Sequence, residues 1–306
     1  MQTAGFEFLV KGDKDQWKYV GHAKIYHQNT FNQSITATET FQPTLTNSTF
    51  HRARREAEGN HFKVQTEQAF ERKRDEGFFN VFAALYYQHH HNNALSQGAE
   101  FSADPKDAYR AASLDSLFLS SSERLAKLLT NRQQNQEKSR EHAWSGKVNA
   151  NYFSKVAHTP DYFKIEVNAD FEHKTGTIFS DYRLRYGQSA QSLRPDEHQL
   201  RFVDVPTTKI HAKFRTEYVY RPEWGSITPF LDVSAAHLED NRNFYRLDRL
   251  GAGTPEFGAL PSTTAALLQT LDTPNSYDSR HNSLDGTLGA RCTIWLGGKL
   301  PNQHIT

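Results

Sequence analysis

The sequence predicts an all-β fold: an antiparallel, up-and-down transmembrane β-barrel segment of about nine strands that forms an incomplete, open barrel. Three observations predict this class. Apolar and polar side chains alternate with a two-residue period along the chain, short turns alternate with long connections, and aromatic residues gather near the short turns. Aromatic residues make up 12% of the chain, which is too many for a disordered protein.

The alternation starts near the N-terminus. Between Trp17 and His27 the odd positions are apolar or small, whereas the even positions are mostly polar. Between Phe79 and Tyr87 every odd position is apolar. Alternation of this length indicates strands with two different faces. The strands predicted in this half of the chain are Gly5–Lys11, Trp17–Phe41, Asn60–Arg72 and Phe78–Ala99.

The second half of the chain alternates more cleanly. Within Tyr162–His173 the odd positions from Phe163 to Phe171 are all apolar, while the even positions from Lys164 to Glu172 are charged or amide residues. The same pattern recurs from Thr207 to Tyr220. The strands predicted here are His142–Val156, Tyr162–Tyr186, Thr207–Arg221, Ser226–Leu247 and Arg280–Leu296.

The connections alternate in length, as in outer-membrane barrels with short periplasmic turns and long extracellular loops. Short polar turns are expected at Gly12–Gln16, Arg72–Gly77, Ala157–Asp161 and Arg221–Gly225. Long excursions are expected at Phe41–Gly59, Ser96–His142, Gly187–Val205 and Asp248–Asn282. One short helix, Leu114–Leu129, is predicted inside a long loop because its leucines share a helical face, and the polar tract Asn131–Glu141 is predicted to be solvated.

The apolar faces of these strands need a cover, and the sequence offers no second layer of elements to supply one. A bilayer can cover them if the backbone groups are paired within the sheet. The residues predicted to face lipid on the convex side are Phe163, Ile165, Val167, Ala169, Phe214, Tyr218, Leu231, Val233, Leu288 and Ile294. Those predicted to face the concave, wet side are Lys164, Glu166, Lys213, Arg215 and Arg291.

Aromatic side chains near the short turns predict a girdle at the membrane interface, because amphipathic rings prefer the headgroup level. The residues assigned to it are Trp17, Tyr19, Phe79, Tyr152, Tyr220, Trp224 and Trp295.

In texture and order the whole chain resembles the β-barrel portion of Gram-negative outer-membrane proteins of the TonB-dependent receptor type. The stretches that carry the resemblance are Asp15–Gln28, Ser48–Gln68, Gly98–Pro105, Gly146–His173 and Asn243–Leu250. The resemblance implies a location in the outer membrane and a part in nutrient or ligand uptake. The partners it implies are outer-membrane lipid, an internal plug, an inner-membrane partner that delivers energy, and a surface lipoprotein.

Residues 1–306 are expected to form one barrel segment with no plug domain and no signal peptide, because neither pattern is present. An odd strand count leaves two open edges, which cannot lie unpaired in lipid. The sequence therefore predicts an incomplete barrel whose remaining strands and plug are missing partners.

The sequence contains no motif for a catalytic nucleophile, a phosphate loop or a metalloprotease, so no catalytic, cofactor-binding or metal-binding residue is predicted. Of the consecutive histidines His89, His90 and His91, strand alternation sends the middle one to the opposite face, which argues against a metal site. The charged stretch Arg52–Glu58 is predicted to be a solvated strand extension. Asp232 and Glu217 are expected to pair with lysine or arginine side chains and stiffen the wall.

Two function classes remain open from the sequence. One is the membrane barrel described above, and the other is a soluble or surface-attached β-rich binding protein, such as an adhesin or a glycan binder. The net charge of +1 provides no overall field for nucleic acid, which is not expected as a partner. The two classes differ in whether the apolar face stays uncovered by protein.

Overall fold

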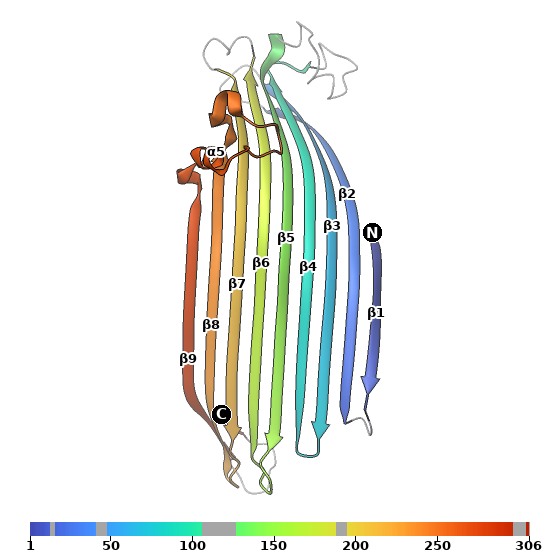
Figure 1. The fold of residues 1–306 in the computed structure, drawn as a ribbon, viewed down its shortest axis with the longest axis vertical. Helices are drawn as coiled ribbons and strands as arrows, with labels where there is room; N and C mark the ends of the chain where they lie inside the picture. Colours follow the sequence, from blue (N-terminus) through green and yellow to red (C-terminus); the bar gives the residue numbers. More distant parts are fainter. Residues whose placement is uncertain (13–15, 41–47, 106–126, 188–194, 296–303, 306) are drawn as a thin grey trace.

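The computed structural model describes residues 1–12, 16–40, 48–105, 127–187, 195–295 and 304–305. The described chain forms one antiparallel sheet in which each strand pairs with the next in sequence, as Figure 1 shows. The strands are β1 Gln2–Lys11, β2 Trp17–Thr40, β3 Thr49–Arg74, β4 Gly77–Phe101, β5 Leu129–Lys155, β6 Tyr162–Tyr186, β7 Glu197–Val219, β8 Gly225–Arg246, β9 Tyr277–Trp295 and the short β10 His304–Ile305. The predicted all-β, up-and-down fold is confirmed. The sheet does not close on itself: within the described chain β1 pairs only with β2.

The connections differ at the two ends of the sheet, as the sequence predicted. β3 and β4 are joined by Asp75 and Glu76 alone, and the other short turns lie at the same end of the strands (Figure 1). The long connection that is described, residues 247–276 between β8 and β9, lies at the opposite end. An up-and-down sheet produces this separation whenever its short and long connections alternate along the chain.

Several predicted strands are longer in the structure, and the extra residues are polar. β5 begins at Leu129, so the tract Asn131–Glu141 is strand rather than a solvated connection; it pairs with β4 on one side and β6 on the other. β3 likewise begins at Thr49 and β7 at Glu197. Both faces of these stretches are polar, so apolar and polar residues do not alternate along them. Backbone pairing with the neighbouring strands defines them as strands, and hydropathy does not reveal that pairing. β1 has 10 residues and is longer than predicted.

The helices also differ from expectation. Most of the predicted helix Leu114–Leu129 falls on residues 106–126, outside the described chain, and its last residue begins β5. Residues 247–276 instead contain the short helices η2 Leu247–Gly253, α5 Thr264–Gln269 and η3 Thr273–Asn275. The hydroxyl of Thr263 caps α5 by accepting a hydrogen bond from the backbone N–H of Ala266 at 3.2 Å. Among the described residues, no helix is long and apolar enough to cross a membrane.

The larger of two small clusters of buried apolar side chains lies where residues 247–276, called the cap below, meet the sheet. Leu200 and Phe202 of β7 are buried there with Tyr245 of β8 and Leu247 of the cap. Phe257, Leu267 and Leu271 of the cap pack against this cluster. The cap therefore covers the loop end of β7 and β8 and extends toward Lys138 of β5, whereas the turn end of the sheet remains a single layer (Figure 1).

Candidate membrane-facing surface

The register of the sheet brings the apolar positions of separate strands onto one face. Residues directly opposite each other in an antiparallel ladder point to the same side. Phe79 of β4 lies opposite Tyr152 of β5, and Tyr152 lies opposite Ile165 of β6. Phe163 of β6 in turn lies opposite Tyr218 of β7. One continuous apolar face therefore runs across the sheet.

All ten residues predicted to face lipid lie on this face. Val167 pairs with Phe214, Phe214 pairs with Val233, and Leu231 pairs with Leu288. Strand alternation adds Ile165, Ala169 and Ile294 to the same side. The five residues predicted to face water, Lys164, Glu166, Lys213, Arg215 and Arg291, lie on the opposite face by the same alternation.

Nothing in the described chain covers this face at the turn end. Phe214 in the middle of the sheet is 38% exposed, Trp144 is 47% exposed, and Leu288 on β9 is 83% exposed. Soluble monomers rarely leave a contiguous apolar surface of more than a few hundred Å² uncovered. An exposed apolar face that crosses nine strands therefore requires a partner or a bilayer.

The apolar side chains form a belt that is about nine residues tall on each long strand, within the ~9–11 residues that a transmembrane strand needs. In each of the strand pairs β2–β3, β4–β5, β6–β7 and β8–β9, called hairpins below, the belt residues of the two strands lie opposite each other in register. We call this surface the apolar belt: Tyr19–His27 on β2, Phe62–Phe70 on β3, Phe79–Tyr87 on β4, Trp144–Tyr152 on β5, Phe163–Phe171 on β6, Ile210–Tyr218 on β7, Ile227–Ala235 on β8 and Leu284–Cys292 on β9.

From each hairpin to the next along the chain, the position of the belt shifts toward the turn end of the sheet. Trp144 at the top of the belt on β5 pairs with His173, two positions above Phe171 on β6. Phe62 and Ile210 show the same two-residue offset, since they pair with His89 and His237. An average step of about one residue per strand, with a rise of ~3.3 Å and a strand spacing of ~4.8 Å, means that the strands cross the belt at a tilt of about 35°.

A row of polar pairs borders the belt on its loop side, and the sequence analysis missed it. The four pairs lie on the belt face directly above the last apolar position of each hairpin: Asn29 with Asn60, His89 with His142, His173 with Thr208, and His237 with Asn282. The rings of His89 and His142 stack with centroids 4.3 Å apart, and His173 Nδ1 lies 3.0 Å from the Thr208 hydroxyl. On β4, β6 and β8 the histidine that follows the apolar run is the sequence signal that marks this row.

The predicted girdle is only partly a single row. Trp17, Phe79 and Tyr152 lie in one cross-strand row on the belt face at its turn-side end, joined through Arg72. Tyr19 and Tyr220 lie on the same face, Tyr220 through its bridge to Ile227. Trp224 lies in the β7–β8 turn, outside any strand, and alternation from Ile294 places Trp295 on the opposite face. A second aromatic contact, Tyr87 with Trp144 at 4.5 Å, marks the loop side of the belt.

The face opposite the belt carries a ladder of ion pairs. Asp232 of β8 lies 3.0 Å from Lys213 and 3.8 Å from Arg215 of β7, and Arg215 lies 3.0 Å from Glu217. The predicted pairing of Asp232 and Glu217 with cationic side chains is therefore confirmed. Between β6 and β7, Asp170 pairs with His211 at 3.1 Å and Glu172 with Lys209 at 3.3 Å. These pairs make this part of the face polar and suited to contact with water.

Two predictions about charged residues above the belt can be compared with the structure. Arg52 is not solvated: it is buried and lies 3.0 Å from Asp104, while Arg54 pairs with Glu56. His90 lies on the opposite face from His89 and His91, as predicted, with its ring 5.9 Å from that of His61. Within the described residues no group of His, Cys, Asp and Glu side chains is placed to hold a metal ion.

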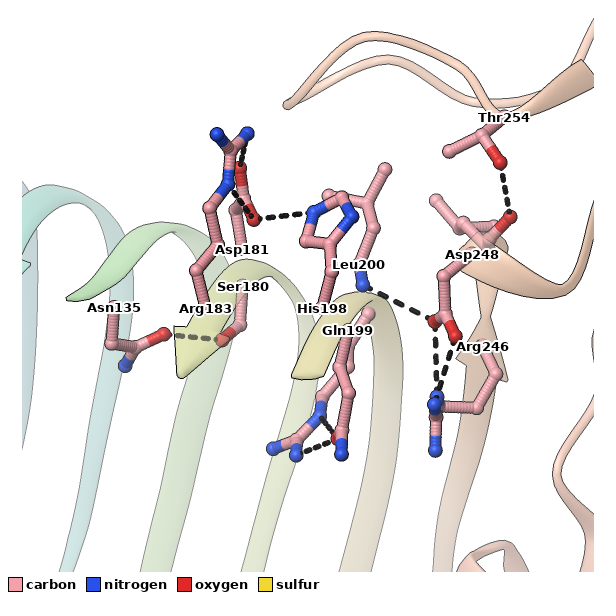
Figure 2. Close-up of polar contacts among 12 residues, drawn as sticks. Asn135, Ser180, Asp181, Arg183, His198, Gln199, Leu200, Arg246, Asp248 and Thr254 are labelled. Atoms are coloured by element: carbon pink, nitrogen blue, oxygen red, sulfur yellow. Dashed lines mark hydrogen bonds and ion pairs between the residues drawn. The ribbon is translucent and has the colours of Figure 1, made fainter. Parts of the chain in front are cut away.

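Hydrogen bonds tie the cap to the loop end of the sheet, as Figure 2 shows. The carboxylate of Asp248 accepts from the Arg246 guanidinium at 2.8 and 3.0 Å and from the backbone N–H of Leu200 at 3.2 Å. Burial alone would raise the pKa of Asp248, but the hydrogen bond and charge of Arg246 hold that pKa below its usual value. Asp181 binds Arg183 and His198 in the same region, and its hydrogen bond raises the pKa of Arg183.

No protein-family model matches this chain, and no curated protein matches it either. The geometry of the sheet is therefore the basis for a functional conclusion.

Proposed function

We propose that this chain is a segment of an outer-membrane β-barrel of the TonB-dependent receptor type, and that it contributes to the uptake of a nutrient or ligand. The observation that carries the proposal is the apolar belt. It is continuous across the sheet, has the height of a membrane-crossing strand, and is left uncovered by the rest of the described chain. A bilayer is the cover that fits such a surface.

Two further features support a membrane barrel over a soluble sheet. The strand tilt of about 35° inferred from the stepped belt agrees with the ~35–45° of transmembrane barrels. The short turns at one end and the long connection of residues 247–276 at the other match the periplasmic and extracellular sides of such barrels. In this orientation the cap lies on the extracellular side, where a ligand would first be met.

The open sheet sets the partners that the proposal needs. Lipid covers the belt, and the remaining strands of the wall pair with β1 and with the part of β9 that β10 leaves open, because unpaired backbone groups in hydrocarbon are costly. The resemblance to TonB-dependent receptors adds a plug inside the wall, an inner-membrane protein that supplies energy, and a surface lipoprotein.

The test compares two neighbouring positions on β6. Val167→Cys and Asn168→Cys, each made in a Cys292→Ser background, place a thiol on the belt face and on the opposite face. After reconstitution into phosphatidylcholine vesicles, a water-soluble maleimide should label Cys at 168 readily and leave Cys at 167 largely unmodified. Equal labelling of both thiols, or a chain that stays off the vesicles, would contradict the membrane proposal.

The long polar part of the sheet beyond the belt, on its loop side, favours a second candidate function. On β5 the stretch from Leu129 to Ala143 lies beyond the belt and is mostly polar, so much of the sheet is built for water. A surface-attached binding protein, such as an adhesin or a glycan binder, would use this wall directly. The thiol test separates the two candidates, because a water-exposed sheet labels at both positions.

A further inference from the structure

A cluster of cationic side chains lies on the belt face directly above the belt. β5 supplies His142, Arg140 and Lys138 at alternate positions, and β4 supplies His89 and His91. His91 pairs directly with Arg140, so the cluster is one compact patch across two strands. We call it the basic patch.

No carboxylate lies directly beside the central pair of the basic patch on the adjacent strands. The nearest carboxylates on this face are offset from it: Glu58 of β3 lies opposite Asn93, and Asp204 of β7 lies beyond Thr177. Asn60 and Thr177 lie level with its central pair, His91 and Arg140, on the adjacent strands β3 and β6. The carboxylate of Asp181, the nearest on the adjacent strand β6, is engaged by Arg183 and His198. In the described part of the chain, the side chains of Arg140 and Lys138 make no hydrogen bond or ion pair, although their backbones are paired in the sheet.

The two histidines beside Arg140, His91 and His142, lie in a positively charged environment. Burial lowers the pKa of His91, and the charges of Arg140 and Lys138 lower it further. Burial also lowers the pKa of His142, followed by the effects of His89 and Arg140. No carboxylate offsets these effects at either ring. A site with this electrostatic character attracts an anion.

The position of the patch determines which anion can reach it. Below it lies Trp144, the last belt residue on β5, and above it the cap approaches: a Cβ atom on Gly258 would lie 3.7 Å from Lys138 Nζ. The hydroxyls of Thr175 and Thr177 on β6 lie level with His142 and Arg140 and add hydrogen-bond donors. The patch thus forms a shelf between the apolar belt and the cap, at the level where lipid headgroups begin.

We propose that the basic patch binds the phosphate group of a phosphorylated lipid in the outer leaflet, with the acyl chains of that lipid packed against the apolar belt below. Arginine and lysine together recognise phosphate through charge-assisted hydrogen bonds. The inference rests on the proposed membrane function, because the acyl chains need the belt to face the bilayer. A lipid fits this site better than a soluble phosphate, because a soluble phosphate would contact only the basic patch and leave the apolar belt below it uncovered.

Energy transfer from tryptophan to a pyrene-labelled lipid tests the proposal, since Trp144 borders the patch. The full chain is reconstituted into phosphatidylcholine vesicles that contain a trace of pyrene-labelled phosphatidate or, in parallel, pyrene-labelled phosphatidylcholine. Phosphatidate should give the stronger transfer. The double variant Lys138→Gln/Arg140→Gln should reduce its enrichment by about tenfold, as expected for the loss of two charge-assisted contacts.

The matched control is Lys174→Gln/Lys209→Gln, which removes two positive charges from the opposite face at a similar height. This control should keep the preference for phosphatidate. Equal transfer from both lipids, or equal loss in both double variants, would overturn the lipid site while leaving the membrane proposal intact. Displacement of phosphatidate by millimolar inorganic phosphate would show a soluble-anion site instead. Failure to insert into pure phosphatidylcholine vesicles would overturn the membrane proposal and this inference together.

Discussion

Val148 lies midway along the belt on β5, between Ala83 and Ala169 of the neighbouring strands, and is 44% exposed. Replacement by arginine at the centre of a lipid-facing strand costs about 2–4 kcal/mol. We therefore expect Val148→Arg to lower the free energy of unfolding in phosphatidylcholine vesicles by this amount, measured by denaturant titration of tryptophan fluorescence.

The neighbouring position provides the control. Asn149 points to the opposite face, where a new positive charge meets water, and substitutions at such sites usually change stability by less than about 0.5 kcal/mol. Asn149→Arg should therefore unfold at nearly the same denaturant concentration as the unmodified chain. If both variants are equally stable, the belt face does not contact lipid.

The cap is the element whose attachment depends most clearly on one carboxylate. Asp248 joins Arg246 to the backbone of Leu200, and the N–H of Asp272 bonds to the Phe244 carbonyl at 2.7 Å. Asp248→Asn removes the charge from a partly buried pair, which costs about 1–3 kcal/mol. Hydrogen exchange at the Asp272 amide should accelerate by one to two powers of ten, while belt amides and an exposed Asp278→Asn control should not change.

The same carboxylate makes the cap sensitive to acid. Because Arg246 lowers the pKa of Asp248 in the folded chain, the stabilisation is present above the unfolded pKa of about 4 and is lost as the pH falls through the lower folded value. Protection of the Asp272 amide, corrected for intrinsic exchange, should decrease on acidification below about pH 4. In the Asp248→Asn variant this decrease should be absent, and its persistence there would assign the effect to another group.

The elements predicted best are those that contain the belt. Tyr162–Tyr186 was predicted at its observed bounds because apolar and charged residues alternate cleanly in its first half. The beginning of β5 was missed because both faces of Asn131–Glu141 are polar, and its place in the sheet depends on pairing with β4 and β6. The shared face of the belt could be predicted from alternation, whereas the polar row and the basic patch needed the register between strands.

At the scale of the whole molecule, the open edges govern behaviour in isolation. β1 has 10 residues and is long enough to cross a bilayer, so its length does not prevent closure; among the described residues, however, its outer edge has no partner strand. Each backbone group left unpaired in hydrocarbon costs several kcal/mol. The chain alone should therefore associate through its edges in detergent or lipid rather than form a monomeric channel.

Gel mobility before and after heating, together with single-channel recording, checks this expectation. We expect oligomers held by edge pairing and no steady conductance from a monomer. A compact monomer that shifts on heating and conducts steadily would show that the chain closes into a barrel by itself.

The stepped belt also determines which membrane suits the chain. About nine residues at a rise of ~3.3 Å and a tilt of about 35° span only about 24 Å along the membrane normal, less than the ~30 Å hydrocarbon thickness of an average bilayer. Hydrophobic mismatch costs fractions of a kcal/mol per Å, and the bacterial outer membrane is thinner than average. Unfolding should therefore require more denaturant in dilauroyl than in dioleoyl phosphatidylcholine vesicles, because the polar pairs at His89, His173 and His237 would be drawn into hydrocarbon in the thicker bilayer. Membrane thickness would then favour insertion of the chain into the outer membrane over thicker membranes, independently of any targeting signal.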